Sequence, residues 1–230
     1  MVIGIIGAMD EEIERLKSKM TILSEEMVAN CLFIRGTLQN KDIVLLKSGI
    51  GKVNAALATT ILHQNYEPDY VINTGSAGGL DSSLSIGDIV IGDRVVHHDV
   101  DATAFNYQYG QVPGMPENYQ ADQTLIQIVE RSIRSINRVK CKQGLIATGD
   151  SFIQKPEAVS FIRERFPNVI AVEMEAVAIA QVCYQYDTPF VVIRALSDIA
   201  GQDSAQSFDE FINQAASHAA ELIIKVVEQL

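Results

Sequence analysis

Short runs of apolar residues alternate along the chain with stretches in which apolar residues recur every three or four positions. Several runs, among them VIGIIG at Val2–Gly7 and FVVIRAL at Phe190–Leu196, are almost continuously apolar. Strands that are covered by helices on both faces have this composition. The pattern predicts strands at Val2–Gly7, Cys31–Gly36, Asp42–Ser48, Asp69–Thr74, Ile86–Val96, Gln143–Thr148, Val169–Met174 and Phe190–Leu196.

Helical periodicity is clearest near the C-terminus. Apolar side chains from Phe208 to Val227 follow the i, i+3, i+4, i+7 spacing of one helix face, and Ser207 and Glu210 form a capping-box pattern at its start. The same spacing predicts helices at Glu11–Met20, Lys52–Tyr66, Asp122–Arg134, Pro156–Phe166, Glu175–Tyr186 and Phe208–Glu228. Because strands and helices alternate without a repeat or linker, we expect one domain over residues 1–230. Its fold class is α/β, with three α/β/α layers around a mixed, mostly parallel, twisted sheet.

The segment His97–Ala121 breaks this alternation. It is long for a connection within a compact domain, and it contains Phe105, Tyr107, Tyr109 and Tyr119. These aromatic residues argue against disorder. Contact with a partner, a lid over a site and irregular packing into the core remain open as interpretations.

The charge balance excludes some classes of function. The 29 acidic and 18 basic residues give a formal net charge of −11, which disfavours binding to nucleic acid or to anionic membranes. The three cysteines are scattered and include no CxxC pair, so we expect a reducing, cytoplasmic environment. The N-terminus lacks the basic region of a signal peptide, and no stretch has the length of a membrane span.

Glycine and polar residues follow six of the predicted strands. The segments are Gly7–Glu12, Gly49–Lys52, Asn73–Gly79, Gly149–Ile153, Glu173–Glu175 and Arg194–Asp198. Ligands of open α/β sheets bind beyond the carboxyl ends of the strands, where these segments would meet. We therefore expect the functional site at this edge of the sheet.

Some of these segments also fit simpler interpretations. Gly49–Lys52 lacks the earlier glycine and the following Ser or Thr of a phosphate loop, which excludes a nucleoside-triphosphate site. Glu11 and Glu12 would stabilise the start of a helix even without a catalytic role. The histidines and aspartates of His97–Asp101 have no helical metal-ligand spacing, so we expect a solvated loop there and no metal site.

Two carboxylates, Glu173 and Glu175, lie two positions apart at a strand end. In an extended chain both would point to the same face, with Arg194 as a candidate partner. A carboxylate can accept both hydroxyls of a vicinal diol, which indicates ribose. A helix cap and a structural salt bridge remain an equal alternative. Asp198, after another apolar strand, fits either a cap or a catalytic acid.

Taken together, these motifs carry a family resemblance. IGIIGAMDEE, LLKSGIGKVNAA, INTGSAGG, ATGDSFI, AVEMEAVAIA, VIRALSD and SFDEF occur in order along the whole chain. The set resembles the bacterial 5′-methylthioadenosine/S-adenosylhomocysteine nucleosidases. The resemblance implies a purine nucleoside phosphorylase-like fold, a homodimer, no cofactor and a place in methionine salvage. It also implies hydrolysis of the bond between adenine N9 and ribose C1′ through an oxocarbenium-like transition state.

The same resemblance implies roles for individual residues. Glu12 would activate water as the general base, and Asp198 would protonate the departing adenine at N7, which requires a raised pKa. Glu175 and the Met174 amide would hold the ribose hydroxyls beside Arg194. The other implied contacts are Phe152 and Ile153 for adenine, Ser76, Gly78 and Ser197 for the water and ribose region, Met9, Ile50 and Phe208 for the alkylthio group, and Phe105 and Pro113 of the 97–121 loop for the neighbouring subunit's pocket.

Other functions remain as alternatives. A phosphate-dependent phosphorylase of the same family would need arginines around Gly75–Gly79, and few are available. A related adenine nucleoside, such as an aminodeoxyfutalosine, could occupy the same pocket. A nucleoside-binding module without activity would need neither Glu12 nor Asp198. A regulatory interaction protein would have no reason to place six polar strand ends together.

Overall fold

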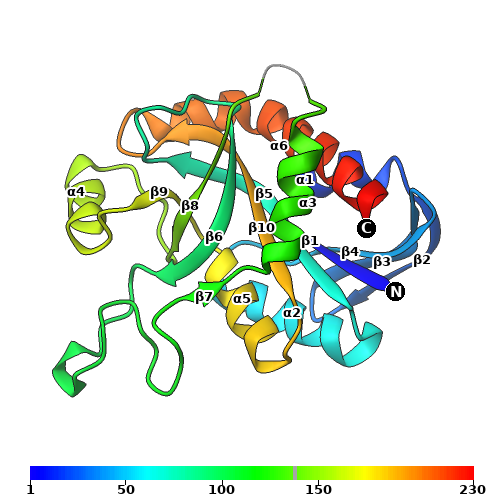
Figure 1. Cartoon of the computed structure of the whole chain (residues 1–230), viewed down its shortest axis with the longest axis horizontal. Helices are drawn as coiled ribbons and strands as arrows, with labels where there is room; N and C mark the ends of the chain where they lie inside the picture. Colours follow the sequence, from blue (N-terminus) through cyan, green and yellow to red (C-terminus); the bar gives the residue numbers. More distant parts are fainter. Residues whose placement is uncertain (137–138) are drawn as a thin grey trace.

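The computed structural model describes residues 1–136 and 139–230, and its ten strands join in one mixed sheet (Figure 1). The strands are β1 (Val2–Gly7), β2 (Thr21–Val28), β3 (Cys31–Leu38), β4 (Lys41–Lys47), β5 (Tyr70–Gly79), β6 (Ile89–His97), β7 (Tyr119–Gln120), β8 (Cys141–Thr148), β9 (Val169–Glu173) and β10 (Phe190–Ile199). The main path runs β10-β6-β8-β9-β5-β1-β4-β3-β2. Because β5 pairs with both β9 and β10, the first five strands of this path close on one another.

Helices cover the sheet on two sides, as the alternation of elements predicts. They are α1 (Asp10–Lys17), α2 (Lys52–Tyr66), α3 (Gln123–Ile133), α4 (Pro156–Arg165), α5 (Ala176–Gln185) and α6 (Ser204–Gln229). α1 and α3 pack with α6 on one side, and α2 packs with α5 on the other (Figure 1). None of the helices in the described ranges has the combined length and apolarity needed to span a membrane. The three-layer α/β/α arrangement is confirmed.

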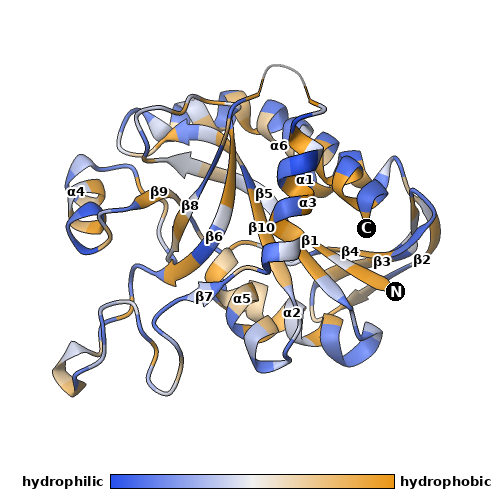
Figure 2. Cartoon of the chain, in the orientation of Figure 1, coloured by the Kyte–Doolittle hydropathy of each residue, from blue (hydrophilic) through white to orange (hydrophobic). Residues whose placement is uncertain are grey.

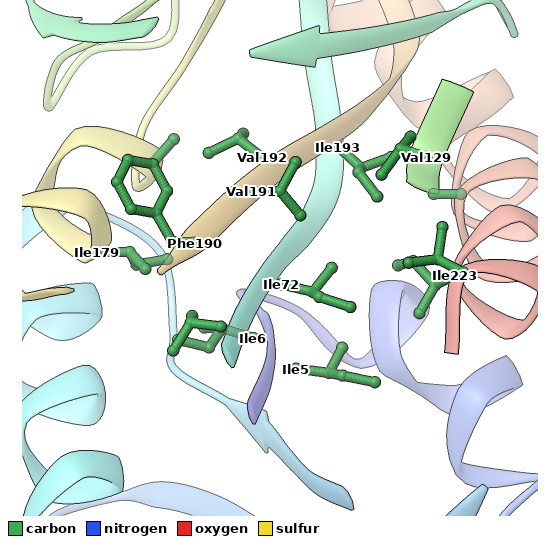
Figure 3. Packing of buried hydrophobic residues seen from close by; sticks show 14 of the residues in the cluster. Ile5, Ile6, Ile72, Val129, Ile179, Phe190, Val191, Val192, Ile193 and Ile223 are labelled. Atoms are coloured by element: carbon green, nitrogen blue, oxygen red, sulfur yellow. The ribbon is translucent and has the colours of Figure 1, made fainter. Parts of the chain in front are cut away.

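The apolar strands form the core because their alternate side chains enter different helical layers. Figure 3 shows Ile5, Ile72 and Ile193 directed toward Ile223 of α6, whereas Ile6 lies on the opposite side, toward α5. Each of these residues is fully buried. In Figure 2 the central strands are mostly hydrophobic and the surface helices carry both colours. Burial on both faces therefore explains the continuous apolar runs.

The sheet contains more antiparallel pairing than the apolar runs predict. β1 pairs in parallel with β4 and β5, and β5 pairs in parallel with β10, so the strands that lead to the predicted site have the expected direction. β2–β3, β3–β4, β5–β9, β6–β7 and β6–β10 are antiparallel. β2 and β7 are absent from the sequence prediction.

The start of the last helix also differs from the prediction. α6 begins at Ser204 after Asp203, so Ser207 lies inside the helix and does not cap it. The capping-box prediction for Ser207 and Glu210 is therefore wrong. Ser204 is buried and the next two residues, Ala205 and Gln206, are exposed, so the first turn adds no apolar residue to the buried face of the helix.

The long segment after β6 divides into packed and exposed parts. Tyr119 is 3% exposed and its ring lies 5.7 Å from that of Tyr184, and Tyr109 packs against Phe161 and Phe166. Phe105, in a short 3₁₀ turn, is 77% exposed. Core packing therefore accounts for Tyr119, half-buried aromatic contacts account for Tyr109, and Phe105 has no contact of either kind with the described residues to explain it.

Candidate active site

A cavity of about 370 Å³ lies where the six predicted strand-end segments converge. Its walls come from the turns after β1, β4 and β8, from the ends of β5, β9 and β10, and from the start of α6. The lining residues are Ala8, Met9, Glu12, Ile50, Ser76, Ala77, Gly78, Ser151, Phe152, Ile153, Val172, Glu173, Met174, Glu175, Ser197, Asp198, Ala200, Ala205, Phe208 and Asp209. The cavity thus brings together twelve of the fifteen residues that the sequence predicts for the site.

Both oxygens of the Glu12 carboxylate accept hydrogen bonds. Oε2 accepts the backbone N–H groups of Ala8 at 2.7 Å and Met9 at 3.3 Å. Oε1 accepts the backbone N–H of Ser76 at 2.9 Å and its hydroxyl at 3.2 Å. Glu12 is 4% exposed, yet it borders the cavity. It therefore closes the first turn of α1, as the helix-dipole interpretation expects, and it also presents a fixed carboxylate to the site.

Glycine is required beside this carboxylate. A Cβ atom on Gly75 would lie 2.7 Å from Glu12 Oε1 and in direct collision with the Arg194 guanidinium, and the φ of Gly75 is +152°. The strand can therefore approach Glu12 only where a side chain is missing.

Glu173 serves a structural role at the floor of the cavity. Its Oε2 accepts the backbone N–H groups of Glu175 at 3.0 Å and Ala176 at 2.8 Å, and it pairs with Arg194. Its Oε1 bonds the Thr148 hydroxyl, which in turn accepts the Val177 N–H at 3.0 Å. This carboxylate caps α5 and neutralises a buried arginine, so the cap and salt-bridge interpretation holds for Glu173.

Glu175 has fewer protein partners. Oε1 accepts the Gly51 N–H at 2.9 Å, and Oε2 lies 3.7 Å from Arg194 Nη2. Burial raises the pKa of Glu175, the nearby Glu173 carboxylate raises it further, and Arg194 opposes both effects. Its oxygens therefore retain the capacity to accept hydrogen bonds from a ligand.

Arg194 lies behind the cavity and not in its wall. It is completely buried, with Nη1 donating to the Thr74 carbonyl at 2.8 Å and Nη2 donating to Asn73 Oδ1 at 2.9 Å. Its guanidinium acts on the site through Glu173 and Glu175. The described cavity lining does not include Arg194, and a direct contact of Arg194 with a ligand stays a prediction.

Asp198 reaches the cavity through an irregularity in β10. The register with β5 shifts between Leu196 and Asp198, so Ser197 is the extra residue of a bulge. The Ser197 hydroxyl donates to Asp198 Oδ1 at 2.9 Å, and Asp198 is 2% exposed. Burial raises the pKa of Asp198 to about 6, although the serine hydrogen bond opposes this. A carboxyl with this pKa can hold a proton close to neutral pH.

Apolar and aromatic side chains form the remaining walls. Phe152 and Phe208 meet edge to face, with ring centroids 5.7 Å apart, and Met9 and Ile50 complete the apolar lining. Phe152 and Ile50 remain 40% and 51% exposed, so this part of the cavity is open to the outside. Such walls suit a flat base and a neutral apolar substituent.

Phe105 and Pro113 lie outside this cavity, and their role at a neighbouring subunit stays a prediction. Several lining residues were not among the predicted contacts, namely Ala8, Ala77, Ser151, Val172, Glu173, Ala200, Ala205 and Asp209. Most of them flank a predicted residue in sequence, and that adjacency is the signal that could have identified them.

The expectation of a solvated loop at His97 and His98 is wrong. Both side chains are 6% exposed, because β6 continues to His97 and pairs it with Thr148. Burial lowers the pKa of both imidazoles. Across residues 1–136 and 139–230, no group of three or more His, Cys, Asp or Glu side chains is arranged to hold a metal ion.

Comparisons with known proteins agree with this geometry. The family model described as the phosphorylase superfamily matches residues 2–228. A 5′-methylthioadenosine/S-adenosylhomocysteine nucleosidase of Geobacillus sp. is 56% identical, and the match covers 100% of this chain and 99% of that protein.

Solved structures give the same result. The nucleosidase of that name from Neisseria meningitidis, in complex with methylthio-immucillin-A, has a TM-score of 0.98 and 47% identity, covering 100% of this chain and 99% of that one. A futalosine hydrolase of Helicobacter pylori has a TM-score of 0.95 and 32% identity, covering 100% and 98%. The chain therefore belongs to the phosphorylase superfamily and, within it, to the 5′-methylthioadenosine/S-adenosylhomocysteine nucleosidases.

Proposed function

We propose that this chain hydrolyses the N-glycosidic bond of 5′-methylthioadenosine and S-adenosylhomocysteine. The products are adenine and either 5-methylthioribose or S-ribosylhomocysteine. The observation that carries the proposal is the position of two carboxyl groups beside β5. Glu12 is bonded to Ser76, and Asp198 Oδ2 lies 3.1 Å from the site of a Cβ atom on Gly78. Inverting glycosidases likewise use an acid and a base that act from separate positions on the scissile bond.

The two carboxyl groups are suited to opposite proton transfers. Asp198, with its pKa raised to about 6, donates a proton to adenine N7 as the base departs. Glu12 accepts a proton from the water that attacks C1′. Its four hydrogen bonds from Ala8, Met9 and Ser76 fix the direction of that carboxylate. The attacking water and the departing adenine therefore exchange protons with carboxyl groups in different parts of the cavity.

Glu175 is the ribose anchor in this proposal. Gly51 and Arg194 engage its carboxylate from the protein side, which leaves acceptor capacity for the two ribose hydroxyls. Phe152 supports the adenine ring, and Met9, Ile50 and Phe208 enclose the thioether. An uncharged 5′ substituent suits this apolar wall.

A water nucleophile fits the charges of the cavity better than phosphate does. The lining that the structure describes includes Glu12, Glu173, Glu175, Asp198 and Asp209 but neither Arg nor Lys. A phosphate dianion would have carboxylates nearby and no facing cation. This favours the hydrolase over the phosphorylase alternative.

The exposed apolar residues support a homodimer. Val53 on α2 is 79% exposed and Tyr184 on α5 is 53% exposed. The two helices pack side by side, and the His63 ring of α2 stacks on that of Tyr186 just after α5. Phe105 of the 97–121 loop is 77% exposed and would reach the cavity of the second subunit. A location in the cytoplasm is consistent with three free thiols. Release of the thiosugar would serve methionine salvage.

The test is adenine release from both thionucleosides, followed by chromatography, with adenosine 5′-monophosphate as the control nucleotide. We expect release from both thionucleosides and very little from the nucleotide, because its phosphate would meet an apolar, acidic wall. Equal release from the nucleotide would contradict the assignment of the pocket.

A further inference from the structure

The loop that leads into Phe152, the proposed adenine contact, is hydrogen-bonded to the Gly49–Lys52 loop, which holds the proposed ribose anchor Glu175. Asp150 directly precedes the cavity residues Ser151, Phe152 and Ile153. Its Oδ1 accepts the backbone N–H of Lys52 at 2.8 Å, across 98 positions of sequence. Asp150 itself is absent from the cavity lining, and its side chain is 49% exposed.

This hydrogen bond closes a helix start that has no cap of its own. The residue before α2 is Gly51, with a φ of +94° and no side-chain cap. The first N–H groups of a helix have no partner within the helix, so Asp150 supplies from another loop what an N-cap residue normally supplies. A Cβ atom on Gly51 would lie 3.1 Å from Asp150 Oδ1, which shows how closely the two loops approach.

The peptide group that Asp150 fixes directly follows the peptide group that holds Glu175. The Gly51 N–H donates to Glu175 Oε1 at 2.9 Å, and the next N–H along the chain, that of Lys52, donates to Asp150. The orientation of this short turn therefore sets both bonds together. If the Asp150 bond is lost, the Gly51 N–H is free to turn away from Glu175.

Asp99 holds Asp150 in turn. Asp99 Oδ2 accepts the Asp150 backbone N–H at 3.0 Å, and Asp99 Oδ1 accepts from Lys52 Nζ at 2.6 Å. Lys52 and Asp99 are only 18% and 31% exposed in their side chains. Lys52, which makes Gly49–Lys52 resemble a phosphate loop, thus links its own loop to the loops of Asp99 and Asp150.

We propose that Asp150 is a positioning residue for the ribose site, acting through the Lys52 and Gly51 amides on Glu175 and held in place by Asp99. It touches no substrate. It sets the distance between Phe152 and Glu175. The preference for a substrate with a 2′-hydroxyl over its 2′-deoxy analogue therefore depends on it. This inference rests on the proposed function.

The test compares kcat/KM for 5′-methylthioadenosine with kcat/KM for its 2′-deoxy analogue. Asp150→Ala is expected to lower the first value roughly tenfold, since small misplacements at a reacting centre are costly, and to lower the second value less. The ribo-to-deoxy ratio therefore falls. Asp150→Asn keeps an oxygen acceptor for the Lys52 N–H and is expected to restore most of the wild-type ratio.

Asp122→Ala is the matched control. Asp122 caps α3 by accepting the Leu125 N–H at 2.9 Å, away from the cavity lining. Its loss removes a helix cap and should lower thermal stability without changing the ribo-to-deoxy ratio. Asp99→Ala is a second variant, expected to shift the ratio in the same direction as Asp150→Ala.

The outcomes separate the two claims. If the wild-type chain releases no adenine from methylthioadenosine, the proposed function fails and the inference fails with it. If the wild type is active but Asp150→Ala keeps the wild-type ratio, or Asp150→Asn is as impaired as Asp150→Ala, only the positioning role is overturned.

Discussion

Ser76 donates two hydrogen bonds to one oxygen of Glu12, from its backbone N–H at 2.9 Å and from its hydroxyl at 3.2 Å. The two residues are 64 positions apart and come from different elements. The contact attaches the first turn of α1 to the end of β5. The proposed base is therefore oriented by the sheet as well as by its own helix.

Glu12→Gln is expected to reduce kcat by at least about 100-fold, because an amide cannot take a proton from water. The fold should persist, since the side chain keeps its shape. One of the N–H groups that now face a carboxylate oxygen would face an amide NH₂, so stability should fall by about 1–3 kcal/mol. Steady-state kinetics together with thermal unfolding checks both effects. Turnover close to that of the wild type would rule out Glu12 as the base.

Asp198 should control the alkaline side of the pH profile. A general acid works in its protonated form, and the pKa of Asp198 is raised to about 6 by burial. We therefore expect kcat/KM to decline as pH rises through about 6, and Asp198→Asn to abolish turnover at every pH. A profile that stays flat between pH 5 and 8, measured under the same conditions, would contradict this role.

The same residue should destabilise the folded chain at high pH. Its pKa rises from 3.8 to about 6 on folding, so the stability that this one group contributes is greatest below pH 4 and is lost as pH rises through about 6. Asp198→Asn cannot ionise, and its amide oxygen can still accept from Ser197. At pH 8 the variant should be more stable than the wild type by about 2–3 kcal/mol, and near pH 4 this advantage should vanish. Denaturant unfolding at both pH values measures the difference.

Glu175→Ala should raise KM and also lower kcat, because the lost contact both binds the ribose and orients C1′. Glu175 would bond both ribose hydroxyls at about 0.5–1.5 kcal/mol each, so kcat/KM should fall roughly 10- to 100-fold. Arg194 keeps its ion pair with Glu173, which protects the fold. The effect should be smaller with the 2′-deoxy substrate. An equal effect on both substrates would argue against contact with the diol.

Phe152→Ala should weaken binding of the base. Stacking of a base on an aromatic ring contributes about 1–3 kcal/mol, which predicts a KM roughly 10- to 100-fold higher. Phe161→Ala is a matched control, since Phe161 is 41% exposed and Phe152 is 40% exposed, but Phe161 lies outside the cavity. Initial-rate kinetics on both variants would detect the difference. Similar KM values for the two would contradict the assignment of Phe152.

The elements that position the site could be predicted because they are buried on both faces. Lys52–Tyr66 matches α2 at both ends, and Val2–Gly7 matches β1. β2 could not be predicted, because nearly all of Thr21–Val28 is exposed and the edge strand has no apolar face to produce a pattern. The start of α6 at Ser204 could not be predicted because Ser204 and Gln206 are polar and give the first turn no apolar pattern.

At the site, the sequence predicted which residues lie together but not which of them have a structural role. Glu173 and Glu175 are alike in type and neighbours in sequence. Only the contacts to Thr148 and Arg194 show that Glu173 has a structural role. The bulge at Ser197, which directs Asp198 into the cavity, depends on pairing with β5 and has no local signature.

The most direct test of the central claim is the fate of the sugar when methylthioadenosine is turned over with and without phosphate. Chromatography measures adenine, and phosphorus NMR detects any sugar phosphate. The carboxylate-lined cavity predicts equal rates in both buffers, with one free methylthioribose for each adenine. Formation of a sugar 1-phosphate, or adenine release only when phosphate is present, would contradict hydrolysis by Glu12 and Asp198.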